Sequence, residues 1–244
     1  MIGLLASVKS DIGRMREINE DSYAFHPPYL FAVADGMGGH AAGEVASGLA
    51  IRALLEKVEA GYGKIPLQNL MEDAISHANE LIYQVSLSKP EYLGMGTTLT
   101  AVYVEADTVY WSHVGDSRLY LFQKDNMLQI TSDHSLVWEL FLNGNITRDE
   151  MQTHPQRNML TRAVGTSSDI KIDSGVFQWK PGDHLLLCTD GLTNMLSEQD
   201  ILQILAVNSV AVEGQKVVDN LIDKANEAGG MDNITAIWLQ YGDV

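Results

Sequence analysis

Four aspartates in this sequence lie at the ends of apolar runs of strand length. Asp35, Asp116 and Asp190 each come just after such a run, and Asp232 comes just before one. In antiparallel neighbours the start of one strand lies beside the end of the next, so all four carboxylates can share one sheet edge. Gathered there, they would repel one another and raise one another's pKa unless cations lay among them.

A cation site built from these residues would have oxygen ligands only. The sequence has one cysteine and no Cys or His cluster at metal-ligand spacing. Carboxylate oxygens favour hard ions such as Mg²⁺ or Mn²⁺ over Zn²⁺. Each of the pairs Asp35-Gly36, Gly115-Asp116 and Asp190-Gly191 is typical of a plain turn on its own. Taken together, the three pairs favour a metal site.

Two other phosphate-handling chemistries are excluded by spacing. A cysteine-based phosphatase needs an arginine six positions after its nucleophile, and the residue six after Cys188 is Asn194. A haloacid-dehalogenase-like phosphotransferase needs two aspartates two positions apart, and the residue two before Asp190 is Cys188. We therefore expect Cys188 to be an inert core thiol, and Ser117 and Thr189 to be structural hydroxyls rather than nucleophiles.

Short apolar runs and helical stripes alternate along the chain. Apolar runs span residues 2–8, 30–34, 98–104, 109–114, 119–122, 185–188 and 234–239. The links within 98–130 are too short for a crossover helix, so we expect an antiparallel meander there and no doubly wound parallel sheet. Apolar residues recur at spacings of three and four in 45–58, 67–85 and 217–225, which predicts helices with one buried face. Without an internal repeat or linker, residues 1–244 are predicted to form one α+β domain.

Composition narrows the class of protein. A chain of 244 residues with 45% hydrophobic and 20% charged residues can bury a sizeable core. Acidic residues outnumber basic ones 32 to 16, and the formal charge of -16 repels phosphate backbones and anionic lipid. We expect no nucleic-acid partner. The single cysteine and the lack of a leader or long apolar run predict a soluble cytoplasmic protein without membrane insertion.

Eight short motifs follow one another along nearly the whole chain. They occupy residues 16–21, 34–40, 94–98, 114–118, 131–135, 160–165, 188–191 and 230–235, and include Ala34-Asp35-Gly36-Met37-Gly38-Gly39-His40 and Gly230-Met231-Asp232-Asn233. In type, order and spacing they resemble the metal-dependent protein phosphatases of type 2C, especially the compact bacterial single-domain members. The resemblance implies a four-layer α-β-β-α sandwich of two antiparallel sheets flanked by helices, with a dinuclear metal centre at the sheet edge.

The resemblance also implies roles for individual residues. Asp35 would bridge two ions, Gly36 would lend its carbonyl to one of them, and Asp190 and Asp232 would complete the other. Asp116 with Asp190 would hold a weaker third ion. Arg16 would bind the substrate phosphate through its planar guanidinium group. Asp21 would act through metal-bound water, and Asn233 would lie next to the metal ligands.

The resemblance also concerns a loop-rich segment beside the cleft and the acid that protonates the leaving group. Residues 134–160, which we call the flap segment, resemble the variable flap beside the cleft and would carry specificity for protein substrates. In many eukaryotic relatives a histidine follows the Asp-Gly pair as the acid for the leaving group, but Met37 stands there. His40 can supply that acid, or it can merely precede a helix that begins near residue 41.

The implied function is Mn²⁺- or Mg²⁺-dependent hydrolysis of phosphoserine and phosphothreonine in proteins. A water shared by two ions would attack phosphorus directly, without a phosphoenzyme. The protein would be a monomer that opposes a Ser/Thr kinase. Two alternatives stay open. One is a non-catalytic signalling module, which the presence of Arg16 together with Asp35, Asp190 and Asp232 disfavours. The other is a hydrolase of small phosphate esters, on which the sequence is silent.

Overall fold

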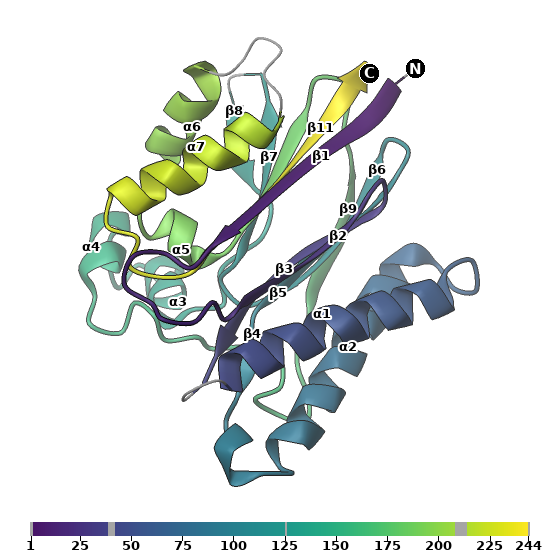
Figure 1. Cartoon of the computed structure of the whole chain (residues 1–244), viewed down its shortest axis with the longest axis vertical. Helices are drawn as coiled ribbons and strands as arrows, with labels where there is room; N and C mark the ends of the chain where they lie inside the picture. The colour runs from purple at the N-terminus through teal and green to yellow at the C-terminus, as the bar shows by residue number, and fades with distance from the viewer. Residues whose placement is uncertain (1, 39–41, 125, 208–213, 244) are drawn as a thin grey trace.

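Two antiparallel sheets packed face to face form the centre of the protein (Figure 1). The computed structural model describes residues 2–38, 42–124, 126–207 and 214–243. One sheet has the strand order β1-β11-β10-β7-β8 and the other has the order β2-β3-β5-β6-β9, with β4 paired to β3. The strands are β1 (Ile2–Asp11), β2 (Asp21–His26), β3 (Leu30–Met37), β4 (Gly96–Thr97), β5 (Leu99–Glu105), β6 (Thr108–Val114), β7 (Arg118–Gln123), β8 (Asn126–Gln129), β9 (Asp173–Gln178), β10 (His184–Cys188) and β11 (Ile234–Asp243).

Helices cover the outer faces of both sheets. Helices α1 (Ala42–Gly61) and α2 (Leu67–Ser86) lie on the β3 sheet, and α6 (Glu198–Val207) and α7 (Gly214–Glu227) lie on the β11 sheet (Figure 1). The shorter helices η1 (Pro90–Tyr92), α3 (Leu136–Leu142), α4 (Arg148–Thr153) and α5 (Asp190–Thr193) complete the described elements. The predicted α-β-β-α sandwich is confirmed. In the described residues, no helix has the length and apolar character needed to cross a bilayer.

The central strands are apolar throughout because both of their faces are buried. In β3, Phe31 and Val33 face the core between the sheets, while Ala32 and Ala34 face the core under α1 and α2. The same alternation in β10 divides its residues between the core shared by the sheets and the core under α7. Successive side chains point to opposite faces of a strand, so a doubly covered strand needs apolar residues at every position.

Several described elements were not predicted, among them the strands β2, β4 and β9 and the helices α5 and α6. The strands β2 and β9 are the two edges of their sheet and are only partly buried. Partly exposed strands need no continuous apolar run, so their signal is weak. The three helices expected from periodicity are α1, α2 and α7: α1 and α7 extend two or three residues further at each end than predicted, and α2 ends one residue later.

The meander predicted over 98–130 is wrong at its middle link. Strand β5 pairs with β6 and β7 pairs with β8, but β6 and β7 belong to different sheets. The link Gly115-Asp116-Ser117 is therefore a corner from one sheet to the other. Gly115 adopts φ +113°, and a Cβ there would overlap the side chain of Thr98. A short link excludes a crossover helix without requiring a hairpin, and the corner carries Asp116 to the junction of the sheets.

Candidate active site

Two aspartates face each other across neighbouring strands. Asp35 lies inside β3, two residues before its end, rather than past the strand as predicted. Asp21, the first residue of β2, is its direct partner in the antiparallel register. Like charges in this arrangement are destabilising. Burial, and then the charge of Asp21, raise the pKa of Asp35 well above its ordinary value.

The other three aspartates reach the same place from different elements. Asp116 comes from the corner after β6, and Asp190 is the first residue of α5 directly after β10. Asp232 precedes β11, whose start pairs with the end of β10, as the sequence predicted. The charges of all three contribute to the raised pKa of Asp35. The structure thus gathers Asp21 and the four predicted aspartates into one group, which we call the carboxylate cluster.

Burial governs protonation in the carboxylate cluster. It is the main reason why the pKa values of Asp116 and Asp190 are raised, followed by the charge of Asp190 on Asp116 and of Asp232 on Asp190. Burial also raises the pKa of Asp21 to about 7, although hydrogen bonds from Thr235 and Thr189 act in the opposite direction. A metal-free site therefore holds protons that cations would displace.

The donor set of the carboxylate cluster fits divalent cations. Asp21 Oδ1 is buried and accepts no hydrogen bond from the described residues, and the carboxyl groups of Asp35 and Asp190 lie within hydrogen-bond reach of each other. Buried oxygens without partners are costly unless something else satisfies them. Within the described ranges, no three His, Cys, Asp or Glu side chains already surround a point where a metal would fit.

Threonine hydroxyls fix the backbone and side chains of the carboxylate cluster. The Asp35 N–H donates to Thr98 Oγ1 at 2.9 Å, and Thr97 Oγ1 donates to the Asp35 carbonyl at 2.8 Å. Thr189 and Thr235 donate to Asp21 Oδ2 at 2.9 and 2.6 Å. Thr189 is thus a hydrogen-bond donor to a carboxylate. Sequence reasoning assigned no role to the other three threonines, although all lie within or beside the quoted motifs.

Gly36 is required by a close approach of two backbones. Its N–H donates to the Glu20 carbonyl at 3.1 Å, and a Cβ at this position would overlap the carbonyl of Gly43 in α1. The helix therefore packs against the end of β3 with no room for a side chain. This packing fixes the backbone of Gly36, whose carbonyl is the predicted ligand, against the start of α1.

The loop before β2 carries Arg16 to the carboxylate cluster. Arg16 Nη2 donates to Asp232 Oδ2 at 2.7 Å, and Nη1 lies 4.0 Å from Glu20 Oε2. The buried side chain of Asn233 holds this loop at both ends. Its Nδ2 donates to the carbonyls of Ile12 and Ile18 at 2.9 and 3.0 Å, and its Oδ1 accepts from the Glu20 N–H at 2.8 Å.

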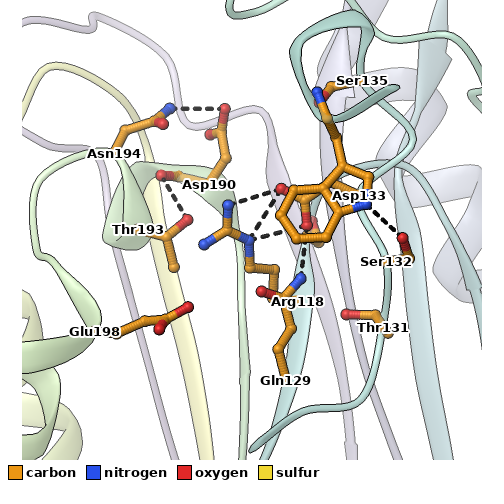
Figure 2. A network of polar contacts seen from close by, with 12 residues as sticks. Arg118, Gln129, Thr131, Ser132, Asp133, Ser135, Asp190, Thr193, Asn194 and Glu198 are labelled. Carbon is orange, nitrogen blue, oxygen red and sulfur yellow. Dashed lines mark hydrogen bonds and ion pairs between the residues drawn. The ribbon is translucent and has the colours of Figure 1, made fainter. Parts of the chain in front are cut away.

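A groove of about 790 Å³ lies beside Asp116 and Asp190, between the flap segment and helices α5 and α6. Its lining includes Arg118, which donates to both carboxylate oxygens of Asp133 at 2.7 to 3.1 Å (Figure 2). At the rim, Arg148 of α4 forms an ion pair of 2.6 Å with Glu198 of α6. The groove thus connects the flap segment to the carboxylate cluster.

The predicted acid His40 lies outside the residues that the structure describes. Met37, which stands where many eukaryotic relatives have a histidine, is the last residue of β3 and is partly buried. The identity of the group that protonates the leaving alkoxide therefore stays a prediction.

Solved structures of bacterial phosphatases share this fold. The Mycobacterium tuberculosis serine/threonine phosphatase PstP/Ppp is 36% identical, with a TM-score of 0.90 and complete coverage of both chains. The catalytic domain of PstP in complex with two manganese ions is 34% identical, with a TM-score of 0.89 and complete coverage of both chains. Serine/threonine phosphatase stp of Listeria innocua is 38% identical over 242 residues, which cover 96% of this chain and 95% of that protein.

The fold and the carboxylate cluster define the class as a metal-dependent phosphatase built on two packed sheets. The family described as protein phosphatase 2C matches residues 15–224, and the chain belongs to that family.

Proposed function

We propose that this chain is a metal-dependent phosphatase that hydrolyses phosphoserine and phosphothreonine in proteins. The observation that carries the proposal is the carboxylate cluster, five partly or fully buried aspartates gathered where the two sheets meet, with Asp21 Oδ1 left unpartnered by the described residues. Relatives over nearly the full length of the chain are serine/threonine phosphatases, which supports the same substrate class.

Two Mn²⁺ or Mg²⁺ ions fit the donor set, with a weaker third. Asp35 would bridge the first two, the Gly36 carbonyl would serve one, and Asp190 and Asp232 would serve the other. Asp116 with Asp190 would hold the third. When bound, such ions neutralise phosphate charge and lower the pKa of a shared water toward neutrality. The related PstP structure with two manganese ions supports this stoichiometry for the tight sites.

The chain's own residues supply substrate binding and orientation. Arg16 binds the phosphate: a guanidinium carries five N–H donors, so its bond to Asp232 leaves others for phosphate oxygens. Asn233 keeps the Arg16 loop in place. Asp21, held through Oδ2 by two threonines, offers its unpartnered Oδ1 as a hydrogen-bond acceptor for the attacking water.

Activity assays with and without metal test this function. We expect the protein to hydrolyse a phosphothreonine peptide with Mn²⁺, to lose activity in EDTA, and to hydrolyse a sugar phosphate far more slowly. Asp35→Ala should remove activity outright, because the bridging position serves both ions. No turnover of any phosphate ester with Mn²⁺ would favour the non-catalytic module. Faster turnover of the sugar phosphate than of the phosphopeptide would favour the alternative of a hydrolase of small phosphate esters.

Several finer assignments belong to the same proposal. Residues 1–244 act as one catalytic domain, with the flap segment as its substrate-facing part. The protein works as a cytoplasmic monomer, and its partners include a cognate Ser/Thr kinase and the proteins that this kinase phosphorylates. A buried free thiol at Cys188 is compatible with a reducing compartment.

A further inference from the structure

The corner that carries Asp116 is held from one side by His134. The Gly115 N–H donates to His134 Nδ1 at 3.0 Å, and the His134 N–H donates back to the Gly115 carbonyl at 2.7 Å. Gly115 precedes Asp116 directly and has the positive φ that turns the chain from one sheet to the other. The direction of the Asp116 side chain therefore depends on this pair of hydrogen bonds.

Threonines hold the opposite side of the same corner. Thr98 Oγ1 and Ser117 Oγ are 2.7 Å apart, and Thr100 Oγ1 donates to the Ser117 carbonyl at 3.1 Å. Thr98 also accepts from the Asp35 N–H, so this side of the corner is tied to the bridging aspartate. On the other side of the corner, the described hydrogen bonds of His134 do not include Asp35, and they connect the corner to a different part of the molecule.

The hydrogen bonds of His134 define its tautomer. Because Nδ1 accepts from a backbone N–H, the ring proton is on Nε2. Nε2 lies 3.2 Å from Asp173 Oδ2, while Asp173 Oδ1 accepts from Arg162 Nη1 at 2.8 Å. The ring is almost fully buried, and it lies against the ring of His113 with centroids 4.7 Å apart. Asp173, held by Arg162, thus keeps the acceptor nitrogen of His134 directed at Gly115.

His134 is also the first residue of the flap segment. Its carbonyl accepts from the Thr161 N–H at 2.8 Å, and the next residue, Ser135, forms a β-bridge with Leu160. The base of the flap segment and the corner of Asp116 therefore share one residue.

We propose that His134 is a positioning residue for Asp116: its imidazole, oriented by Asp173, fixes the corner between β6 and β7 and joins it to the base of the flap segment. The proposal rests on the metal-dependent function above, because it predicts a specific defect in the weakest metal site. Side chains that orient metal ligands through one hydrogen bond typically change metal affinity about 10- to 100-fold when removed. Sites that use Asp35 and Asp232 should be spared.

Two amide substitutions separate the contacts of His134. In His134→Asn the amide oxygen is attached to Cγ, as Nδ1 is, so it can still accept from Gly115 while the contact with Asp173 is lost. In His134→Gln the amide reaches the place of Nε2, so the contact with Asp173 is kept and the Gly115 acceptor is lost. Both variants bury a neutral amide of similar polarity. His184→Asn is the control, because His184 lies in β10 and stacks on Trp238 away from the corner.

Hydrogen exchange and metal titration supply the measurements. In EDTA, exchange of the backbone amides in peptides spanning 114–118 should be about tenfold or more faster in His134→Gln than in wild type. In a calorimetric Mn²⁺ titration the weakest binding step should weaken about tenfold or more in that variant, with the tight steps within twofold. His184→Asn should match wild type in both measurements, and His134→Asn should lose no more than about threefold, because it keeps the Gly115 acceptor but lacks the contact with Asp173 that orients it.

The outcomes separate this proposal from the proposed function. Equal losses in His134→Asn and His134→Gln would show that ring packing matters and not the Nδ1 acceptor, which would overturn the proposal. Unchanged exchange and titration in both variants would also overturn it. If wild-type protein bound no Mn²⁺, the proposed function would fail, whereas the exchange comparison would still decide whether His134 holds the corner.

Discussion

At the scale of single residues, the carboxylate cluster is organised by neutral hydroxyl groups. Asp21 accepts from Thr189 and Thr235 through one oxygen, and its other oxygen is buried without a partner among the described residues. A carboxylate held in this way keeps its direction but is not neutralised, because its hydrogen-bond partners among the described side chains are uncharged hydroxyls. Burial of the charged form of Asp21 therefore costs free energy, and a bound metal ion would reduce this cost.

Asp21→Asn should stabilise the metal-free protein in a pH-dependent way. The folded pKa of Asp21 is about 7 and its ordinary value is 3.8, so the native state retains a proton between these values. Wild-type stability therefore falls as pH rises through this window, and the advantage of the variant should grow to roughly 4 kcal/mol at most above pH 7. Urea unfolding in EDTA at pH 4.5 and 7.5 measures this difference.

The exposed turn residue Asp107 provides the matched control. Asp107→Asn should change the free energy of unfolding by less than about 0.5 kcal/mol at both pH values. An advantage of Asp21→Asn that is equal at pH 4.5 and 7.5 would contradict the raised pKa of Asp21.

At the scale of elements, the site is assembled by loops that one buried side chain holds together. The Arg16 loop is fixed by Asn233, which belongs to the segment that leads into β11. Asp232 and Arg16 therefore move as one unit, although they are far apart in the sequence. The rigidity of this unit sets how well the guanidinium is aimed at phosphate.

Asn233→Ala should loosen the Arg16 loop. Loss of three hydrogen bonds at a buried site should lower the free energy of unfolding by about 1–3 kcal/mol. For a phosphopeptide, kcat/KM should fall about tenfold or more. The loss should be much smaller in an Arg16→Ala background, because both changes then affect the same interaction. Additive losses in the double variant would show that Asn233 acts independently of Arg16; Asn69→Ala, an exposed position in α2, is the control.

The flap segment should affect protein substrates more than small ones. Helices α3 and α4 line a groove of about 790 Å³ next to Asp116 and Asp190, and a groove of that size exceeds what a phosphate group needs. Shortening the segment 142–153, which contains the turn between these helices, should reduce the rates of hydrolysis of phosphoproteins severalfold. The rate on p-nitrophenyl phosphate should stay within twofold of the wild-type rate. Proportional changes on all substrates would contradict a role in substrate recognition.

At the scale of the whole molecule, metal binding should be visible as stability. Ions that bind only the native state stabilise it by about 2.7 kcal/mol per site at 100 times Kd. For a chain of this size, that corresponds to a Tm increase of roughly 5–11 °C for one site. Thermal scans in EDTA, Mn²⁺ and Ca²⁺ measure the effect, and an unchanged Tm between EDTA and millimolar Mn²⁺ would contradict a metal role for the carboxylate cluster.

The sequence predicted features that depend on continuous burial. Strands covered on both faces give apolar runs, so the ends of β6 and β10 and the start of β11 could be located, whereas β3 continues three residues beyond its predicted end and includes Asp35. Edge strands β2 and β9 lack such runs. The corner at Asp116 is as short as a hairpin link. A link of this length can join two strands of one sheet or pass from one sheet to the other, and only the structure distinguishes these cases. Thr97, Thr98 and Thr235 carry no distinctive spacing, because hydroxyl groups serve equally well in ordinary turns.

The pairing of β1 with β11 determines the order in which the chain can be completed during synthesis. Residues 2–11 leave the ribosome before all the other described strands, yet their strand partner among the described residues is residues 234–243, and β11 separates β1 from β10 in the sheet. A nascent chain that stops before residue 234 therefore has two strands with unpaired backbone groups on facing sides. Such open strands favour association with other chains. Of the described strands, the last to be synthesised is thus the one that closes the sheet, and chains that lack residues 234–243 are exposed to aggregation.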